Sequence, residues 1–395
     1  MALRVVAPRP DPGILALPWH RPLATWGGPQ VLDVARGLSR HEVRIVAIDG
    51  LHGEVVLAVK ETTEVLARRE HRALRDLHRL GVPTVETYGV VTDRGEGLPA
   101  ALVTRYLAYS LPYRSAVVDR VASQPVPALV DALVVLLVRL HLAGVYWGDV
   151  SLSNALFRTD AGGFAAFLVD AETVEIHPAL SDGVREHDVR VGGENLFAEL
   201  CDLQAAATLP VDVDPHAVVD LLAQRYAALW NELTSEQEVP VGELWRVEQR
   251  IARLNELGFD VEEVEVTAAA DASTARIRPR VVEQGHHRRE LRALTALEVE
   301  DAQARRLLND LAAFIAHHDL GDVDRVTAAR RWRREVYEPL TALVPQDLAG
   351  RLAPAEFFHE VLVHRWFLSE QAGHEVDIFE TARDYVETVL TGPDR

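Results

Sequence analysis

"VYWGDVSLSNALF", residues 145–157, places one aspartate and one asparagine five positions apart in an otherwise apolar stretch. Asparagine is scarce in this chain, with only five among 395 residues, and Asn154 is one of them. Carboxylate and amide oxygens are the hard ligands that suit a cation such as Mg²⁺. The pairing of Asp149 with Asn154 therefore raises the question of whether the surrounding elements form a scaffold for phosphate chemistry.

The composition, 48% hydrophobic and 26% charged, is that of an ordinary globular protein of two or three domains. The net charge is −19, and both halves are acidic, so we expect no nucleic-acid or anionic-membrane binding. The single cysteine, Cys201, excludes an intrachain disulfide and favours a cytoplasmic location. No signal peptide or transmembrane segment is expected, because the most apolar segment, 128–147, contains Asp131, Arg139 and His141.

Lysine use is extreme, because 40 of the 41 basic residues are arginine and only Lys60 is lysine. A GC-rich genome replaces lysine by arginine wherever a planar guanidinium serves as well as a compact ammonium. One lysine could also remain by chance. The place of Lys60 in the fold therefore decides whether this ammonium is needed.

Hydrophobic periodicity predicts a small antiparallel β lobe followed by a helical lobe. Strands are expected at 31–37, 41–48, 54–61, 85–93 and 99–107, with Lys60 near the end of the third. Helices are expected at 63–81, 127–143, 186–207 and 216–234. Residues 1–30 are predicted to be an extended lead-in segment with one strand at most, and the two lobes occupy 31–108 and 109–238.

A different pattern begins near residue 239 and predicts a mostly α-helical C-terminal domain, 239–395. Its helices are expected at 244–258, 298–318, 325–343, 354–372 and 376–391, with a two-stranded hairpin at about 259–283. The overall prediction is an α+β chain of two lobes and one appended domain.

This order of elements resembles the protein-kinase-like bilobal fold through Lys60, Glu70, Asp149, Asn154 and Asp170. The resemblance implies binding of ATP and Mg²⁺. Lys60 would hold the α- and β-phosphates and Glu70 would pair with it. Asp149 would act as the base, while Asn154 and Asp170 would hold the metal.

Alternatives to these roles remain at the sequence level. Glu61 and Glu64 compete with Glu70 for Lys60, and Glu70 could lie on a solvated helix face. Glu172, in the "DAE" (170–172) that replaces Asp-Phe-Gly, is either a further metal ligand or a solvated carboxylate.

The phosphate-binding loop also departs from the kinase pattern, because no Gly-x-Gly-x-x-Gly lies between the first two strands. "RGLSRH" (36–41) would cover the phosphates through Gly37, Ser39 and Arg40, and Tyr106 is a further candidate for nucleotide contact. "GEN" (193–195) is expected to brace the Asp149 loop from a helix.

A narrower resemblance rests on "WGDVSLSNALF", "LVTRYLAYSLPYR", "GENLFAEL" and "FHEVLVHRWFLSEQAGHEV". These stretches resemble an actinobacterial domain-of-unknown-function family that joins a lipopolysaccharide-kinase-like domain to a family-specific C-terminal domain. The resemblance implies an atypical phosphotransferase acting on a small-molecule, sugar or lipid-linked hydroxyl. Two alternatives stay open: a pseudokinase that engages a protein partner through its C-terminal domain, and a nucleotidyltransferase.

Three other motifs are weaker. "HEVLVH" (359–364) would place His359 and His364 about 140° apart on a helix, which argues against a shared zinc ion. The Arg- and His-rich segment 276–292 is a cationic island that fits a domain interface better than a phosphate site or an acidic partner. In "RRWRR" (330–334), Trp332 is expected to pack and the arginines to be solvated or paired.

Overall fold

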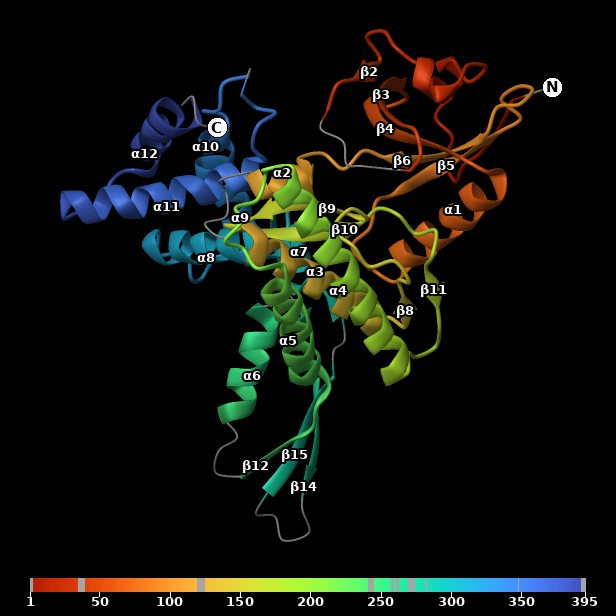
Figure 1. Ribbon diagram of the computed structural model, residues 1–395. Coiled ribbons are helices and arrows are strands. Elements are labelled where there is room, and N and C mark those ends of the chain that lie inside the picture. The colour runs from red at the N-terminus through yellow and green to blue at the C-terminus, as the bar shows by residue number, and fades with distance from the viewer. Residues whose placement is uncertain are drawn as a thin grey trace. The chain divides into compact units, whose positions relative to one another are not determined.

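The computed structural model describes residues 3–34, 40–118, 125–240, 245–256, 259–260, 263–268, 274–280, 283–346 and 348–391. The chain divides into two compact units (Figure 1). Unit 1 comprises Met1–Arg158 and Ala166–Ala227, and unit 2 comprises Thr159–Ala165 and Ala228–Arg395.

A six-stranded antiparallel sheet forms the first part of unit 1. Its order is β1 (Arg4–Val6), β5 (Thr87–Thr92), β6 (Ala100–Arg105), β4 (Gly53–Thr62), β3 (Val43–Gly50) and β2 (Val31–Leu32). Lys60 on β4 lies opposite Val43 on β3 and Leu102 on β6. Side chains alternate between the two faces of a strand, so Lys60 and Ala58 share one face while Leu57 and Val59 point to the other.

Both faces of this sheet are covered within unit 1. Helix α1 (Glu64–Arg79) contacts β5 and β6. The predicted lead-in contains one strand, β1, which pairs with β5, and the segment packs into the lobe, because Trp19 and Trp26 are buried against Leu57 and Val59.

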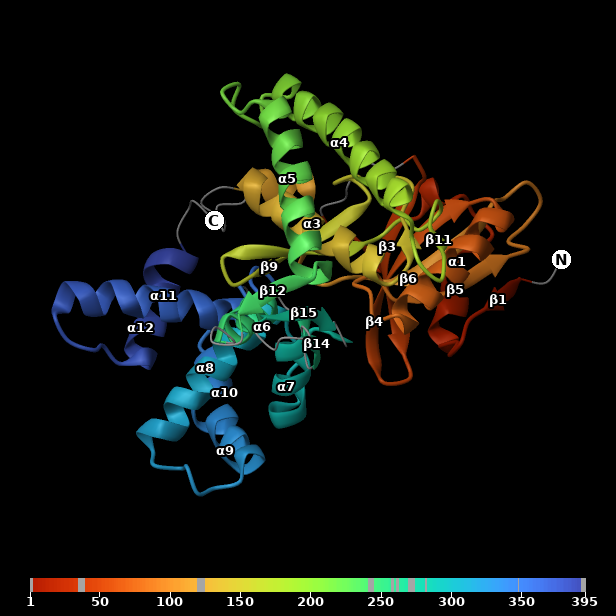
Figure 2. The ribbon, with the colours of Figure 1, turned by 90° about the horizontal axis from the view of Figure 1, so that it is seen from below.

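The second part of unit 1 is built on helices α3 (Pro125–Leu142), α4 (Asp182–Ala205) and the first half of α5 (Pro215–Thr234) (Figures 1 and 2). A buried polar contact joins the three, because His141 of α3 contacts Tyr226 of α5 at 2.6 Å and Asp188 of α4 at 3.1 Å. Short elements complete this part: β7 (Ser110–Pro112), α2 (Tyr113–Val118), β8 (Val145–Tyr146), β9 (Ala155–Asp160), β10 (Gly163–Leu168) and β11 (Glu175–Ile176). Strands β10, β9 and β7 form one sheet, and β11 pairs with β8.

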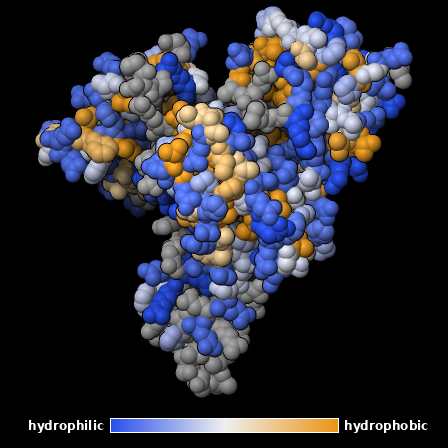
Figure 3. Space-filling view, viewed as in Figure 1, coloured by the Kyte–Doolittle hydropathy of each residue, from blue (hydrophilic) through white to orange (hydrophobic). Residues whose placement is uncertain are grey.

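Among the described helices, α3 alone is long and apolar enough to cross a membrane, but 67% of its apolar window is buried in the protein. Arg139 and His141 on this helix are buried too. A core helix passes the same test of length and hydropathy, so α3 is weak evidence for a span. On the face shown in Figure 3, hydrophobic residues occur as small groups among hydrophilic ones.

Unit 2 is mostly helical apart from two small sheets. Strands β12 (Gln237–Pro240), β15 (Thr274–Arg280) and β14 (Glu263–Ala268) form the first, so the predicted hairpin gains a third strand. Strands β13 (Phe259–Asp260) and β16 (Glu283–Gln284) form the second. The helices are α6 (Trp245–Glu256), α7 (His286–Thr295), α8 (Asp301–His317), α9 (Arg325–Trp332), α10 (Glu338–Thr341), α11 (Pro354–Ala372) and α12 (Ile378–Tyr385).

Two details of unit 2 differ from the periodicity prediction. Helix α7 begins inside the Arg- and His-rich island and ends three residues beyond it. No helix was expected there, because the charged residues hide the apolar positions Leu291 and Leu294. The predicted helices 325–343 and 376–391 each contain a π-helical turn, at Arg333–Tyr337 and Val386–Leu390. The hydrophobic core of this unit combines leucine and alanine side chains with aromatic ones, among them Trp332, which is fully buried.

Candidate functional site

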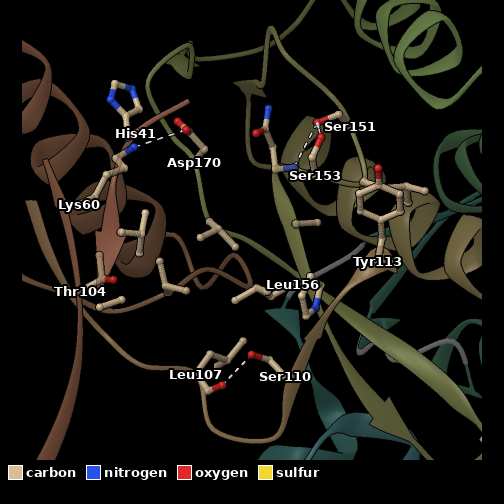
Figure 4. A pocket seen from close by; sticks show the side chains of 18 of the residues that line it. His41, Lys60, Thr104, Leu107, Ser110, Tyr113, Ser151, Ser153, Leu156 and Asp170 are labelled. Atoms are coloured by element: carbon tan, nitrogen blue, oxygen red, sulfur yellow. Dashed lines mark hydrogen bonds and ion pairs between the residues drawn. The ribbon is translucent and has the colours of Figure 1, made fainter. Parts of the chain in front are cut away.

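A cavity of about 440 Å³ opens in unit 1. Apolar side chains of the six-stranded sheet and of β9 line one part, among them Ile45, Ala58, Leu102 and Leu156. In Figure 4, Leu107 and Leu156 lie apart from Lys60 and Asp170. The cavity thus combines an apolar compartment with a charged one, as a nucleobase joined to phosphates requires.

Lys60 is the centre of the charged compartment. Its Nζ lies 2.7 Å from Glu70 Oε2, 3.2 Å from Glu172 Oε1 and 3.4 Å from Asp170 Oδ2. Glu70 is fully buried on α1, so the solvated alternative does not apply to it. The structure therefore brings together three of the five residues on which the kinase-like resemblance rests.

The two competing glutamates have other partners. Glu61 Oε1 accepts a hydrogen bond from Arg94 at 2.7 Å, and Glu64 pairs with Arg68 one helical turn away at 2.8 Å. Glu61 points to the opposite face of β4 from Lys60, because side chains alternate along a strand.

The protonation of this cluster reflects its excess of carboxylates. Burial raises the pKa of Glu70 to about 7, and the adjacent Lys60 ammonium offsets only part of that effect. Burial alone would lower the pKa of Lys60, but the carboxylates of Glu70, Asp170 and Glu172 outweigh it and raise the pKa. Three carboxylates around one ammonium leave negative charge that a bound cation would neutralise.

Glu172 is a functional candidate whose position the sequence left open. Besides Lys60, it contacts His41 Nε2 at 3.1 Å and Arg40 Nη2 at 3.9 Å. Arg40 and His41 therefore reach the charged compartment from the chain segment that precedes β3. The other two predicted loop contacts, Gly37 and Ser39, lie outside the described residues.

Tyr106 lines the cavity at the end of β6, next to Arg105 and Leu107. Its main-chain nitrogen donates to Val56 O at 3.0 Å. This segment therefore borders the apolar compartment while its backbone is tied to β4.

The two residues that opened the sequence analysis contact each other. Asn154 Nδ2 donates to Asp149 Oδ2 at 2.9 Å and to Asp149 O at 3.0 Å. Asn195 Nδ2 donates to the other oxygen of the carboxylate, Asp149 Oδ1, at 3.2 Å and to Val150 O at 3.0 Å. The predicted bracing by "GEN" is confirmed and comes from Asn195.

Helix α4 holds the whole loop along one face. Asp188, Gly192, Asn195 and Glu199 follow at spacings of three or four residues, so they share one side of the helix. A Cβ at Gly192 would lie 2.9 Å from Val150 Cγ1, so only glycine permits this close approach.

Two buried carboxylates of this face bind main-chain nitrogens. Asp188 accepts from Trp147 N at 2.7 Å and from Gly148 N at 2.8 Å. Glu199 accepts from Leu152 N at 3.0 Å and Ser153 N at 2.8 Å. Sequence reasoning did not identify these two residues, because an acidic residue within a helix gives no local sign of its partner.

The residues present suit a hard divalent cation. Glu70, Asp170 and Glu172 each offer a carboxylate oxygen, and these oxygens lie within 4.8 Å of one another. The Nδ2 of Asn154 is committed to Asp149, so its Oδ1 is the atom that can serve a cation. Oxygen donors alone fit Mg²⁺ better than a soft metal.

Two motifs of unit 2 lie in other surroundings. His364 contacts Asp384 at 2.6 Å, while His359 is buried, and no metal-ligating group found in the described part of the chain includes both. Trp332 packs as expected, and its Nε1 donates to Asp310 at 2.7 Å.

Two family models match the chain, one in its kinase-like part and one in its C-terminal part. Residues 56–190 match the family model described as "Lipopolysaccharide kinase (Kdo/WaaP) family", and residues 228–390 match "Domain of unknown function (DUF4032)". The matches confirm the predicted resemblance to a lipopolysaccharide-kinase-like domain followed by a second, family-specific domain. The kinase-like fold class is confirmed as well, with the antiparallel sheet first and a mostly helical C-terminal region.

Among solved structures, "WaaP in complex with acyl carrier protein" matches with 18% identity and a TM-score of 0.36, over 65% of this chain and 99% of that chain. No curated protein matches. The family match supports an atypical kinase-like phosphotransferase, a class that uses a nucleotide and a metal in general.

Proposed function

We propose that this protein transfers the γ-phosphoryl group of ATP, with Mg²⁺, to a hydroxyl of a small molecule, a sugar or a lipid head group. The arrangement of Lys60, Glu70, Asp149, Asn154 and Asp170 around one cavity supports the proposal most strongly. Phosphoryl transfer depends mostly on positioning and charge neutralisation, and side chains of these types can supply both.

The proposed roles follow from contacts. Lys60, held by Glu70, binds phosphate oxygens. Asp170 and Asn154, with Glu172 as a third candidate, hold the metal, which when bound supplies charge neutralisation at the phosphates. Asp149 accepts the proton of the acceptor hydroxyl as the new P–O bond forms and the bond to the β-phosphate oxygen breaks, releasing ADP.

Calorimetric titration of ATP, with and without Mg²⁺, tests the nucleotide site. We expect Mg²⁺-dependent binding in the wild type that Asp170→Ala and Lys60→Ala weaken. Asp76→Asn is the matched control, because Asp76 is an exposed carboxylate of α1 that pairs with Arg79 away from the cavity. The proposed metal site would be rejected if the wild type bound ATP equally well with and without Mg²⁺ and Asp170→Ala bound it as tightly as the wild type.

The base is tested by turnover. Asp149→Ala should keep ATP binding and lose about a hundredfold or more in transfer to an acceptor found by mass spectrometry. Unchanged turnover in this variant would remove Asp149 from the role. Release of pyrophosphate instead of ADP would select nucleotidyl transfer.

A second candidate function rests on Glu172. Its contact with Lys60 engages the ammonium that phosphates would otherwise bind, at the place where the kinase pattern has glycine. A regulatory nucleotide-binding module, engaging a protein through its C-terminal domain, fits that arrangement. This second function would be favoured if the wild type bound ATP stably but transferred no phosphoryl group to any acceptor, and if Glu172→Gly gained turnover.

The acceptor and the location are proposed on simpler grounds. The cavity carries serine, asparagine and aspartate side chains beside Asp149, which can bind the hydroxyl groups of a small molecule. A reducing, cytoplasmic setting accords with the single cysteine.

A further inference from the structure

The two candidate metal ligands lie at the base of one β-hairpin. Strand β9 begins directly after Asn154, and strand β10 ends two residues before Asp170. The strands are hydrogen-bonded neighbours in the sheet. Whatever determines the pairing of β9 with β10 therefore also determines how Asn154 and Asp170 lie relative to each other.

The turn of this hairpin is two residues long and has an unfavourable backbone. Ala161 has φ +53° and Gly162 has φ +85°, and positive φ at both central positions is the condition of a type I′ turn. Asparagine or aspartate is preferred at the first position, whereas alanine in the left-handed region costs about 1–2 kcal/mol. The turn therefore needs support from outside the hairpin.

Glu356 of α11 supplies that support. The hairpin tip, which we define as Thr159–Ala165, belongs to unit 2. Glu356 is fully buried there, and its Oε2 accepts from Ala161 N at 2.9 Å while its Oε1 is 3.4 Å from Gly162 N. One carboxylate thus binds both central amides of the turn.

The start of α8 binds the strand ends that flank the turn. Asp160 accepts from Gln303 N at 2.8 Å and from Ala302 N at 3.2 Å, so it caps the helix from a distant part of the chain. Gln303 Nε2 donates to Thr159 O at 2.9 Å and to Glu356 Oε2 at 2.7 Å. Gln303 therefore links Asp160 of the tip to Glu356, the carboxylate that binds the turn.

We propose that Glu356 and Gln303 are positioning residues for the metal site: by holding the type I′ turn they set the register of β9 and β10, and so the placement of Asn154 and Asp170. Turn geometry fixes register in a two-residue hairpin, and a slip of one residue turns every side chain to the other face. The inference rests on the proposed function insofar as Asn154 and Asp170 bind metal. It assigns to unit 2 a part in catalysis although that unit supplies none of the candidate catalytic residues.

The test compares Glu356→Gln with Asp310→Asn in the full-length protein. Glutamine fills the same space but cannot accept hydrogen bonds at both positions, so it loosens the turn. Asp310 is the matched control, because it is a half-buried carboxylate of unit 2 that accepts a hydrogen bond from Trp332 and not from the tip. We expect the Mg²⁺ concentration for half-maximal ATP binding to rise about tenfold in Glu356→Gln and to stay unchanged in Asp310→Asn.

Two further variants distinguish positioning from general loss of structure. Ala161→Gly removes the left-handed strain at the turn and should restore much of the Mg²⁺ affinity of Glu356→Gln. Gly162→Ala strains the turn without crowding, since its Cβ would meet only His359 Nε2 at 3.7 Å. This variant should also raise the Mg²⁺ concentration for half-maximal ATP binding. Gly162→Ala also serves if Glu356→Gln does not fold.

Hydrogen exchange without nucleotide or metal keeps the test separate from the proposed function. Amides of 149–157 and 166–170 should exchange faster in Glu356→Gln than in the wild type or Asp310→Asn. Unchanged exchange and unchanged Mg²⁺ dependence in a folded variant would overturn the inference. If the wild type binds no ATP, the proposed function fails, while faster exchange in the same segments still supports the link between the tip and the base of the hairpin.

Discussion

Asp188 Oδ1 lies 2.8 Å from the main-chain nitrogen of Gly148, the residue directly before the candidate base. Gly148 has φ +80°, and a Cβ there would lie 3.2 Å from Thr173 O, so the chain turns sharply at this point. A buried carboxylate that binds the turn from α4 therefore determines where Asp149 points.

The first prediction concerns this contact. In Asp188→Asn, the amide NH₂ faces one of the two main-chain NH groups that the carboxylate accepts from, so that NH loses its hydrogen bond. An unsatisfied buried donor lowers the stability of the loop by about 1–3 kcal/mol. We expect kcat to fall at least about tenfold while the affinity for MgATP measured by calorimetry changes little. Asp182→Asn, at an exposed position of the same helix, is the control and should leave both quantities unchanged. Equal loss of kcat in both variants would contradict the assignment.

The second prediction concerns the only lysine. Lys60→Arg keeps the positive charge but replaces a compact ammonium, surrounded by three carboxylates, with a planar guanidinium. We expect MgATP affinity to fall nearly as far as in Lys60→Met. Arg44→Lys, elsewhere in the sheet, controls for the exchange itself. Wild-type affinity in Lys60→Arg would show that charge alone suffices.

A third prediction follows from the pKa of Glu70, which burial raises to about 7. Below pH 7 the carboxyl holds a proton, and above it the carboxylate adds negative charge to the cluster. Affinity for Mg²⁺ in the presence of ATP should therefore rise between pH 6 and pH 8. Glu70→Gln should show weaker binding with a flatter pH profile, and titrations in buffers of different ionisation enthalpy should detect proton release in the wild type only.

Asp160 gives a fourth prediction, on stability. Burial beside Glu300 and Glu356 raises its pKa to about 7 from 3.8. The folded protein then keeps a proton that the unfolded chain has lost, so the free energy of unfolding should fall by a few kcal/mol as the pH rises from about 4 to 7. Urea unfolding of the wild type and of Asp160→Asn should diverge in pH dependence over that range. Glu298→Gln, at a neighbouring exposed carboxylate, should behave like the wild type.

Local pattern was sufficient for much of the candidate site. Lys60 lies near the end of a strand of alternating residues, Glu70 lies on an amphipathic helix, and Asp149 and Asn154 lie five residues apart within one loop. Each depends on neighbours a few positions away, so periodicity and spacing placed these residues on their elements, and the resemblance to protein kinases selected them. The order of the elements carried that resemblance, and the family match confirms the fold class.

Tertiary structure alone decided the partners of the carboxylates around the site. Glu172 contacts Lys60, which lies 112 positions away, and Glu356 binds Ala161 across 195 positions. Asp188 binds Gly148 across 40 positions, and Glu199 binds Ser153 across 46. A carboxylate in a helix has the same local sequence whether it faces water or a distant amide. Its partner is set by the packing of whole elements, because burying its charge is stable only where main-chain donors or a cation meet it.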